Sequence, residues 1–149
     1  MEIILTEGCI CDSLVIDGKE SSEYTSEELI SVIRKILYNE SSKSNLINFL
    51  DLVIDIFSDY ALFVRDSCKY GRFLISFSKN NDIIVNNKCI NDFNEDEIRD
   101  IIIEIINSGK NKANLVWTLR GLVQDYGKYK FCYHCDECGD DVVEYKLKI

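Results

Sequence analysis

The sequence predicts an α+β fold with four helices, arranged as two tandem ββααβ pseudo-repeats that share a strand in one antiparallel or mixed sheet. Three observations predict it: short apolar runs that end in turn residues, amphipathic segments with helical spacing, and the return of the whole pattern after 69 residues. A chain of 149 residues suits one core of ordinary size. We therefore expect a single domain, 1–149, with internal repeats at 1–72 and 73–149.

The repeat comes from a gapless alignment of the chain with itself, which runs from Ile4 opposite Phe73 to Tyr60 opposite Tyr129. Ten of its 57 positions are identical, among them Leu5 and Leu74, and this number is close to chance for so biased a composition. The pattern is more informative than the identities. In both copies a short apolar strand, residues 14–16 or 83–85, leads into a turn pair that tolerates positive φ.

Each unit next begins a helix with the same capping pattern. Thr25 and Asn94 each stand three residues before a glutamate, Glu28 or Glu97, as in a reciprocal capping box. Apolar residues then recur at helical spacing, first over 29–37 and 98–106, and after a polar link over 46–57 and 115–126. The sequence therefore predicts two helices in each unit.

Extended segments close the units. Residues 60–64 follow the second helix of the first copy, and residues 129–133 follow that of the second copy. The segment 72–78 both closes the first copy and opens the second. This double role predicts that the two units share that strand and lie in one continuous sheet.

The outer face of the second helix differs between the copies. Its stripe of carboxylates in the first copy is replaced by basic and amide side chains in the second, and Asn48 is replaced by a tryptophan. We expect a protein partner to bind these positions: Asp51, Asp55, Asp59, Trp117, Arg120 and Gln124. In the structural alternative, the two stripes face each other, or each is an ordinary solvated face.

The net charge of −9 narrows the class of partner. Residues 1–69 carry 6 bases and 13 acids, whereas residues 70–149 carry 11 and 13, so the acidity belongs mainly to the first copy. The electrostatic field of such an acidic protein repels a phosphate backbone and disfavours direct nucleic-acid binding. It suits a protein partner with a basic surface.

Seven cysteines in a chain without an export signal are more typical of thiols or metal ligands than of a disulfide framework. The run Cys135-x-x-Cys138-Gly is half of a zinc-knuckle pattern, and the close pair Cys9 and Cys11 could supply the other half. The first and last strands would have to meet for this site to form. Strand alternation would place Cys132 and His134 on one face and Cys135 off it. We expect a structural zinc held by Cys9, Cys11, Cys135 and Cys138; in the alternative, the thiols are merely buried or idle.

No motif identifies a reaction, and the one histidine, His134, has no recognisable catalytic partner. Residues 1–7 lack a secretory leader, and no apolar run is long enough to span a bilayer. Frequent Ile, Asn, Lys and Tyr, whose codons are AT-rich, favour a low-GC bacterium, its phage or another AT-rich genome as the source.

These observations predict a non-enzymatic cytoplasmic inhibitor that covers a basic surface of a nucleic-acid-processing enzyme. A phage anti-defence protein of the anti-CRISPR type and a toxin-immunity protein both act in this way. The alternative is a zinc-stabilised protein-interaction domain without an inhibitory role, and an acid-dependent enzyme ranks third.

Overall fold

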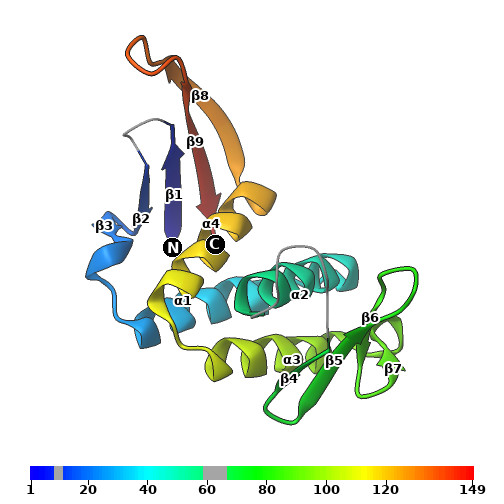
Figure 1. The fold of residues 1–149 in the computed structure, drawn as a ribbon. Coiled ribbons are helices and arrows are strands. Elements are labelled where there is room, and N and C mark those ends of the chain that lie inside the picture. The colour runs from blue at the N-terminus through cyan, green and yellow to red at the C-terminus, as the bar shows by residue number, and fades with distance from the viewer. Residues whose placement is uncertain (9–11, 59–66) are drawn as a thin grey trace.

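The computed structural model describes residues 1–8, 12–58 and 67–149, and its four helices and two antiparallel sheets confirm the α+β class (Figure 1). The first sheet has the strand order β3-β2-β1-β9-β8, and the second has β4-β5-β6-β7. The strands of the first sheet are β1 (Glu2–Glu7), β2 (Ser13–Ile16), β3 (Lys19–Glu20), β8 (Lys128–His134) and β9 (Asp141–Lys148). Those of the second are β4 (Cys68–Tyr70), β5 (Phe73–Phe77), β6 (Ile83–Val85) and β7 (Lys88–Cys89).

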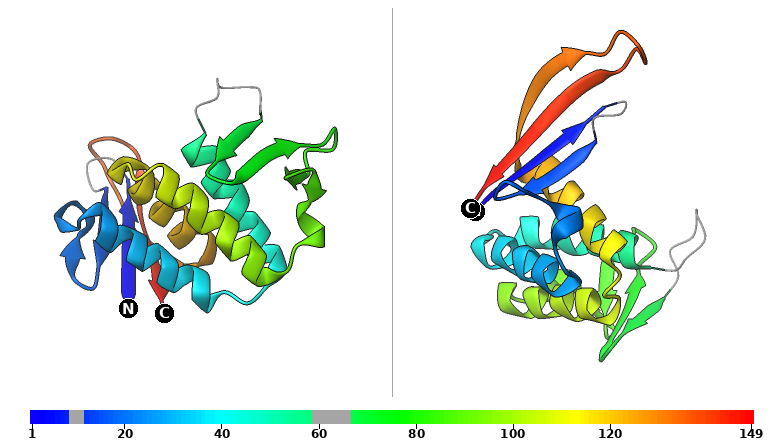
Figure 2. Two further views of the ribbon diagram at one scale, coloured as in Figure 1. Left: turned by 90° about the horizontal axis from the view of Figure 1, so that it is seen from below. Right: turned by 90° about the vertical axis from the view of Figure 1, so that its left-hand side faces the viewer.

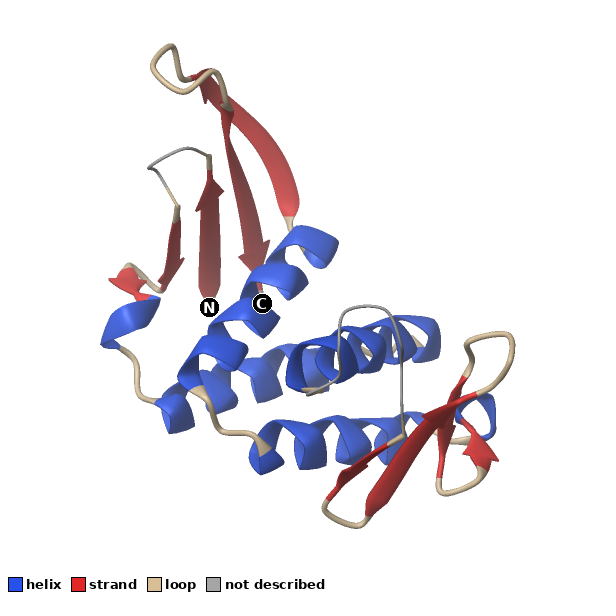
Figure 3. Cartoon of the chain, in the orientation of Figure 1, coloured by secondary structure: helices blue, strands red, loops and turns tan. Residues whose placement is uncertain are grey.

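The helices pack together between the two sheets, which lie on opposite sides of them (Figures 2 and 3). They are α1 (Ser26–Asn39), α2 (Lys43–Phe57), α3 (Glu95–Ser108) and α4 (Lys112–Tyr126), with the short 3-10 turns η1 (Ser21–Glu23) and η2 (Ile90–Asp92). One cluster of buried side chains runs through the helices and the inner faces of both sheets, from Ile3 to Val123. The described part of the chain therefore has one continuous core.

Both predicted capping boxes are confirmed. The Thr25 hydroxyl accepts from the Glu28 N–H at 3.1 Å, and the Glu28 carboxylate accepts from the Thr25 N–H at 3.0 Å. Hydrogen bonding of the Glu28 carboxylate to the Thr25 backbone N–H, and secondly to the Thr25 side chain, holds the pKa of Glu28 below its usual value. Asn94 and Glu97 make the same pair of bonds at 2.8 and 3.0 Å.

The first and last strands meet, as the sequence predicts. β1 pairs with β9 in antiparallel register from Glu2 opposite Lys148 to Glu7 opposite Val143. The chain ends are also tied together, because the Met1 ammonium donates to the Ile149 carbonyl oxygen at 2.8 Å. The C-terminal strand thus completes the sheet that the N-terminal strands begin.

The prediction of one continuous sheet was wrong, and the shared strand is not confirmed. β5, which covers most of the segment 72–78, pairs with β4 and β6 and with no described strand of the first sheet. The helices lie between the two groups of strands and keep them apart (Figure 1). The predicted extended segment 60–64 lies outside the described residues.

The gapless alignment was also wrong in its first strand. Ile3 pairs with Ile16 in the first sheet, and Ile75 pairs with Val85 in the second, so Ile3 corresponds to Ile75. Leu5 is fully buried, whereas Leu74, its partner in the gapless alignment, is 43% exposed. The physical reason is the number of residues between the paired positions, which is twelve between Ile3 and Ile16 but nine between Ile75 and Val85.

Two lysines make matching contacts between the halves. Lys43, at the start of α2, donates from its ammonium to the Asn91 carbonyl oxygen in η2 at 2.5 Å. Lys112, at the start of α4, donates to the Ser22 carbonyl oxygen in η1 at 2.6 Å. Each second helix is therefore tied at its N-terminus to the 3-10 turn of the other half.

Candidate functional site

β8 is the longest described strand or helix in which every residue is exposed. All seven of its residues are exposed, although their sequence, Lys-Tyr-Lys-Phe-Cys-Tyr-His, includes three aromatic rings. β8 and β9 form a hairpin, which we call the arm, that extends beyond the helices (Figures 1 and 2). β8 stands at one end of the strand order, so one of its two edges has no neighbouring strand within the described structure.

The turn from α4 into β8 depends on Gly127. The Gly127 N–H donates to the Val123 carbonyl oxygen at 2.8 Å and ends the helix. A Cβ at this position would collide with that oxygen and lie 3.0 Å from the Lys146 carbonyl oxygen in β9. The glycine thus lets the end of α4 lie against β9, and β8 leaves directly from that contact.

Two of the aromatic rings lie on the helix-facing side of the arm. Tyr129 pairs with Tyr145, and Tyr145 pairs with the buried Leu5, so all three share one face of the sheet. The Tyr129 and Tyr145 rings meet edge to face, with 5.5 Å between their centroids. Phe131 pairs with Val143 on the same face. Because the arm extends past the helices, Tyr129 and Phe131 remain 60% and 50% exposed.

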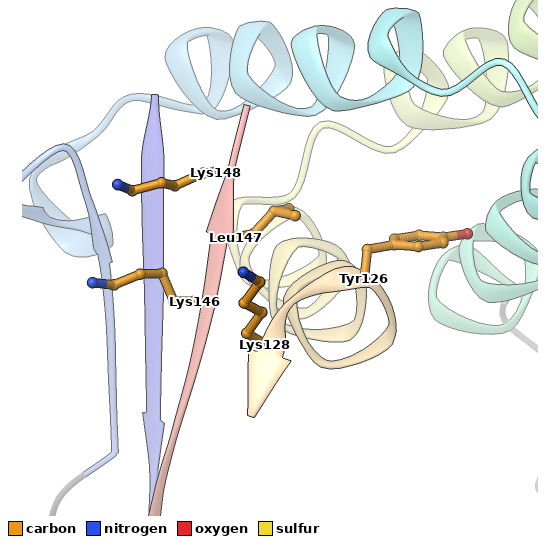
Figure 4. A pocket seen from close by; sticks show the side chains of 5 residues that line it. All are labelled: Tyr126, Lys128, Lys146, Leu147 and Lys148. Atoms are coloured by element: carbon orange, nitrogen blue, oxygen red, sulfur yellow. The ribbon is translucent and has the colours of Figure 1, made fainter. Parts of the chain in front are cut away.

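The opposite face of the arm carries lysines. Lys128 pairs directly with Lys146, and Lys130 pairs with Glu144. Lys128, Lys146 and Lys148 line a pocket of about 450 Å³ together with Tyr126 and Leu147 (Figure 4). Acids on the same face include Glu144, opposite Lys130, and Glu2, whose carboxylate oxygen lies 3.7 Å from the Lys146 ammonium and 3.8 Å from that of Lys148. This face is therefore locally basic on a protein that is acidic overall.

Trp117 is exposed, as the sequence predicts, with 57% of its surface open. The Arg120 guanidinium lies over its ring at 4.7 Å. Arg120 and Gln124, however, both donate to the Glu7 carboxylate at the end of β1, at 2.9 and 2.7 Å. These two predicted partner-binding residues hold α4 against the first sheet, whereas Trp117 remains more than half exposed beside Arg120.

The acidic stripe lies on a different side of the molecule. Asp51 is half-buried in a pocket beside Ile83 and Ile90, where α2 approaches the second sheet. Asp55 is exposed, and Asp59 lies outside the described residues. The two stripes do not face each other, because α4 turns its stripe toward the first sheet and α2 turns Asp51 toward the second.

Of the predicted metal ligands, Cys135 and Cys138 lie in the turn that joins β8 to β9. The Cys135 N–H donates to the Asp140 carbonyl oxygen at 2.8 Å, and Gly139 takes a φ of +76° in this turn. Gly8 lies against the start of β9, since a Cβ there would be 2.6 Å from the Asp141 carbonyl oxygen. Cys9 and Cys11 lie outside the described residues. Cys138 is disulfide-bonded, which differs from the predicted thiol.

The prediction that Cys132 and His134 share a face was based on regular alternation, and this premise was wrong. A register shift between Phe131 and Tyr133 interrupts the strand at Cys132. His134 instead pairs with Asp141, whose carboxylate lies 2.7 Å from Nδ1 of the ring. Among the described residues, no group of three or more His, Cys, Asp or Glu side chains is placed to hold a metal ion.

Sequence reasoning identified residues 129–133 as an extended segment but did not recognise them as a site. The signal was the alternation of lysine with aromatic residues in Lys128-Tyr129-Lys130-Phe131. Alternation of this kind is ordinary for a strand with one covered face. Its exposure depends on where α4 ends relative to the sheet, which the sequence does not report.

Within the described ranges, no helix is both long and apolar enough to cross a membrane. Comparison of the chain with protein-family models, with curated proteins and with solved structures finds no match.

Proposed function

We propose that this chain is a non-enzymatic protein-binding protein and that the arm, together with Trp117, is its contact surface. The observation that carries this proposal is the exposure of every residue of β8, at an open sheet edge, with aromatic side chains among them. Aromatic residues and arginine dominate the energetics of protein interfaces. Folded monomers rarely leave several large rings exposed on one element without an interaction to cover them.

The inhibitor role is a narrower proposal that depends on charge. The net charge of −9 favours a partner with a basic surface, such as the groove of a nucleic-acid-processing enzyme. We expect the acidic stripe of α2 to bind this basic partner. Of the residues in this stripe, Asp55 is exposed, whereas Asp51 is half-buried against the second sheet. Of the two surfaces, the arm therefore has the stronger geometric support.

A photo-crosslinking amino acid at position 131 tests the protein-binding proposal in cells that express the chain. We expect position 131, and likewise position 117, to crosslink to one defined protein. Position 38 is the matched control, because Tyr38 is 59% exposed but lies on α1, away from the arm. The same crosslinking pattern at all three positions, or none at 117 and 131, would contradict the proposal.

A zinc ion held by Cys9, Cys11, Cys135 and Cys138 is our second proposal, and it corresponds to the alternative of a zinc-stabilised interaction domain. Its support is the β1–β9 pairing, which carries Gly8 to the base of the Cys135–Cys138 turn. Two close pairs of thiolates at one place match the ligand set of structural zinc sites. A disulfide at Cys138 competes with this proposal, because a disulfide sulfur is not a thiolate ligand.

Elemental analysis of protein purified without chelator separates the two states. The zinc proposal predicts about one equivalent of zinc per chain, and Cys138→Ser should lower it sharply, since structural sites need their complete ligand set. Cys89→Ser, at a half-buried thiol in β7, is the control and should leave the zinc content unchanged. Less than about a tenth of an equivalent of zinc, with cysteines blocked as disulfide, would reject zinc.

We also infer that the chain arose as a tandem duplication. The helices α1 and α2 have the same lengths as α3 and α4, which follow 69 residues later, and the N-caps of each pair stand at equivalent positions. The paired contacts of Lys43 and Lys112 relate the halves reciprocally. On this account the arm is a specialisation of the second copy.

A further inference from the structure

We propose that β8 recognises its partner by strand addition: an extended segment of the partner, with acidic and apolar residues in alternation, pairs with the open edge of β8. This inference rests on the proposed protein-binding function and names the chemistry of the bound segment. The juxtaposition that supports it is an open edge with aromatic rings on one face and lysines on the other.

The open edge supplies the backbone part of the recognition. An edge strand directs alternate N–H and C=O groups away from its sheet, and these groups form a ladder with an added strand. The opposite edge strand of the same sheet, β3, has only two residues, which leaves little length for pairing. β8 offers four residues, Lys128 to Phe131, before its irregularity near Cys132. Pairing is therefore concentrated in that segment.

The two faces of β8 supply the side-chain part. A strand added beside Lys128–Phe131 would place alternate side chains next to Tyr129 and Phe131 on one face, and next to Lys128 and Lys130 on the other. Apolar side chains fit the rings, which are at least half exposed. Carboxylates fit the lysines. Lys128 already faces Lys146 across the sheet, a like-charge pair that an added acid would relieve.

Other occupants fit less well. A second copy of β8, paired antiparallel over all four residues, would set each lysine opposite an aromatic ring and so mix the two faces. Shifted by one residue to bring the rings onto one face, the pair would set Lys130 directly opposite Lys130, which is unfavourable. A single-stranded nucleic acid could stack on the rings. It would, however, leave the N–H and C=O groups of the strand edge without backbone partners.

Selection of a display library of random peptides of about ten residues on the intact protein tests the inference. Because the library is random, the selected peptides report which sequence pattern the protein binds. We expect enrichment of peptides with Asp or Glu at every second position and apolar residues between them. Selection on Phe131→Asp should lose these peptides, whereas Tyr38→Asp, at an exposed ring on α1, should keep them. Circular dichroism melts of both variants show whether they fold.

A charge swap makes the test specific. The variant Lys128→Glu/Lys130→Glu should bind a synthesised winning peptide about tenfold more weakly or worse, because like charges across an interface are strongly unfavourable. The same peptide with its acids changed to lysine should bind this variant and not the wild type. A proline in the middle of the peptide should abolish binding, since it cannot complete a strand ladder.

Several results would overturn the inference: no enriched pattern, enriched peptides that still bind Phe131→Asp, no rescue in the charge swap, dimerisation through β8, or binding of oligouridylate that Phe131→Asp abolishes. The two proposals fail separately. If position 131 crosslinks to a protein but the peptide selection gives no acidic, alternating pattern, strand addition alone is rejected. If there are neither crosslinks at position 131 nor such a pattern, protein binding through the arm is rejected as well.

Discussion

Gly8 allows the two terminal strands to approach each other closely. It has a φ of +139°, and a Cβ on it would lie 2.6 Å from the Asp141 carbonyl oxygen and 2.9 Å from Cα of Val142. Both the conformation and the contact exclude a side chain. Gly18, in the turn after β2, has a φ of +79° but open space around it.

We predict that Gly8→Ala destabilises the protein more than Gly18→Ala. The turn substitution should cost about 1 kcal/mol from backbone strain alone, and the Gly8 substitution at least about twice that, because it adds a collision with β9. Urea unfolding of both variants measures the difference. Equal losses would mean that β1 and β9 are not in close contact at this point.

Tyr126 links pH to stability. Its hydroxyl donates to the Asn45 carbonyl oxygen at 2.9 Å, between α4 and α2. Burial raises the pKa of Tyr126 to about 12, and the nearby carboxylates of Glu40 and Asp125 add to the rise. The folded state therefore keeps its proton at pH values where the unfolded chain, with a tyrosine pKa of about 10, has lost it.

We predict that the contribution of Tyr126 to stability is fully present below about pH 10 and is lost as the pH rises toward about 12. Tyr126→Phe should remove this component of the alkaline loss and cost about 1 kcal/mol at neutral pH through the missing hydrogen bond. Urea unfolding at a series of pH values checks both, with Tyr38→Phe as the exposed control. If the free energy of unfolding of Tyr126→Phe falls as steeply at alkaline pH as that of the wild type, Tyr126 is not the group responsible.

At the scale of elements, α4 is the helix that holds the first sheet. Arg120 and Gln124 converge on Glu7 at the end of β1, and the Arg120 and Glu7 side chains are only 21% and 25% exposed. Lys110 and Glu27 form a comparable ion pair at 3.0 Å, but their side chains are 52% and 71% exposed. Solvent screening should make the second pair much weaker.

A double-mutant cycle with Glu7→Gln and Arg120→Gln should give a coupling energy of about 1–2 kcal/mol, as for hydrogen bonds to partly buried charges. The matched cycle on Glu27 and Lys110 should give about 0.5 kcal/mol or less. Thermal or urea unfolding supplies both values. Equal coupling energies in the two cycles would show that α4 does not depend on Glu7 for its position.

The elements themselves were predictable where their signals are local. Thr25 with Glu28 and Asn94 with Glu97 predicted the helix starts correctly, because a capping box is formed within four residues. The equivalence of Leu5 and Leu74 failed, because the first hairpin has three more residues between equivalent paired positions than the second, and a gapless alignment cannot show this. The separation of the sheets also failed, since it depends on how helices from both halves pack between them.

The whole molecule combines an acidic, helix-rich body with an arm that is basic on one face and aromatic on the other. The sequence predicted that Trp117 would be exposed but did not predict that Arg120 and Gln124 would bind Glu7, a contact between residues far apart in the chain. It likewise predicted a strand near Tyr129 and Phe131 without its exposure. In our proposal, the contact surface is the arm together with Trp117, which lie outside the buried core that the two halves build together.

Hydrogen–deuterium exchange on the complex with the crosslinked partner tests the central claim most directly, because slowed exchange maps where the backbone becomes protected. The account predicts that the amides of Lys128 to Phe131 exchange much more slowly in the complex, while those around Tyr38 on α1 do not change. Protection around Asp51 and Asp55 on α2, with β8 unaffected, would contradict it.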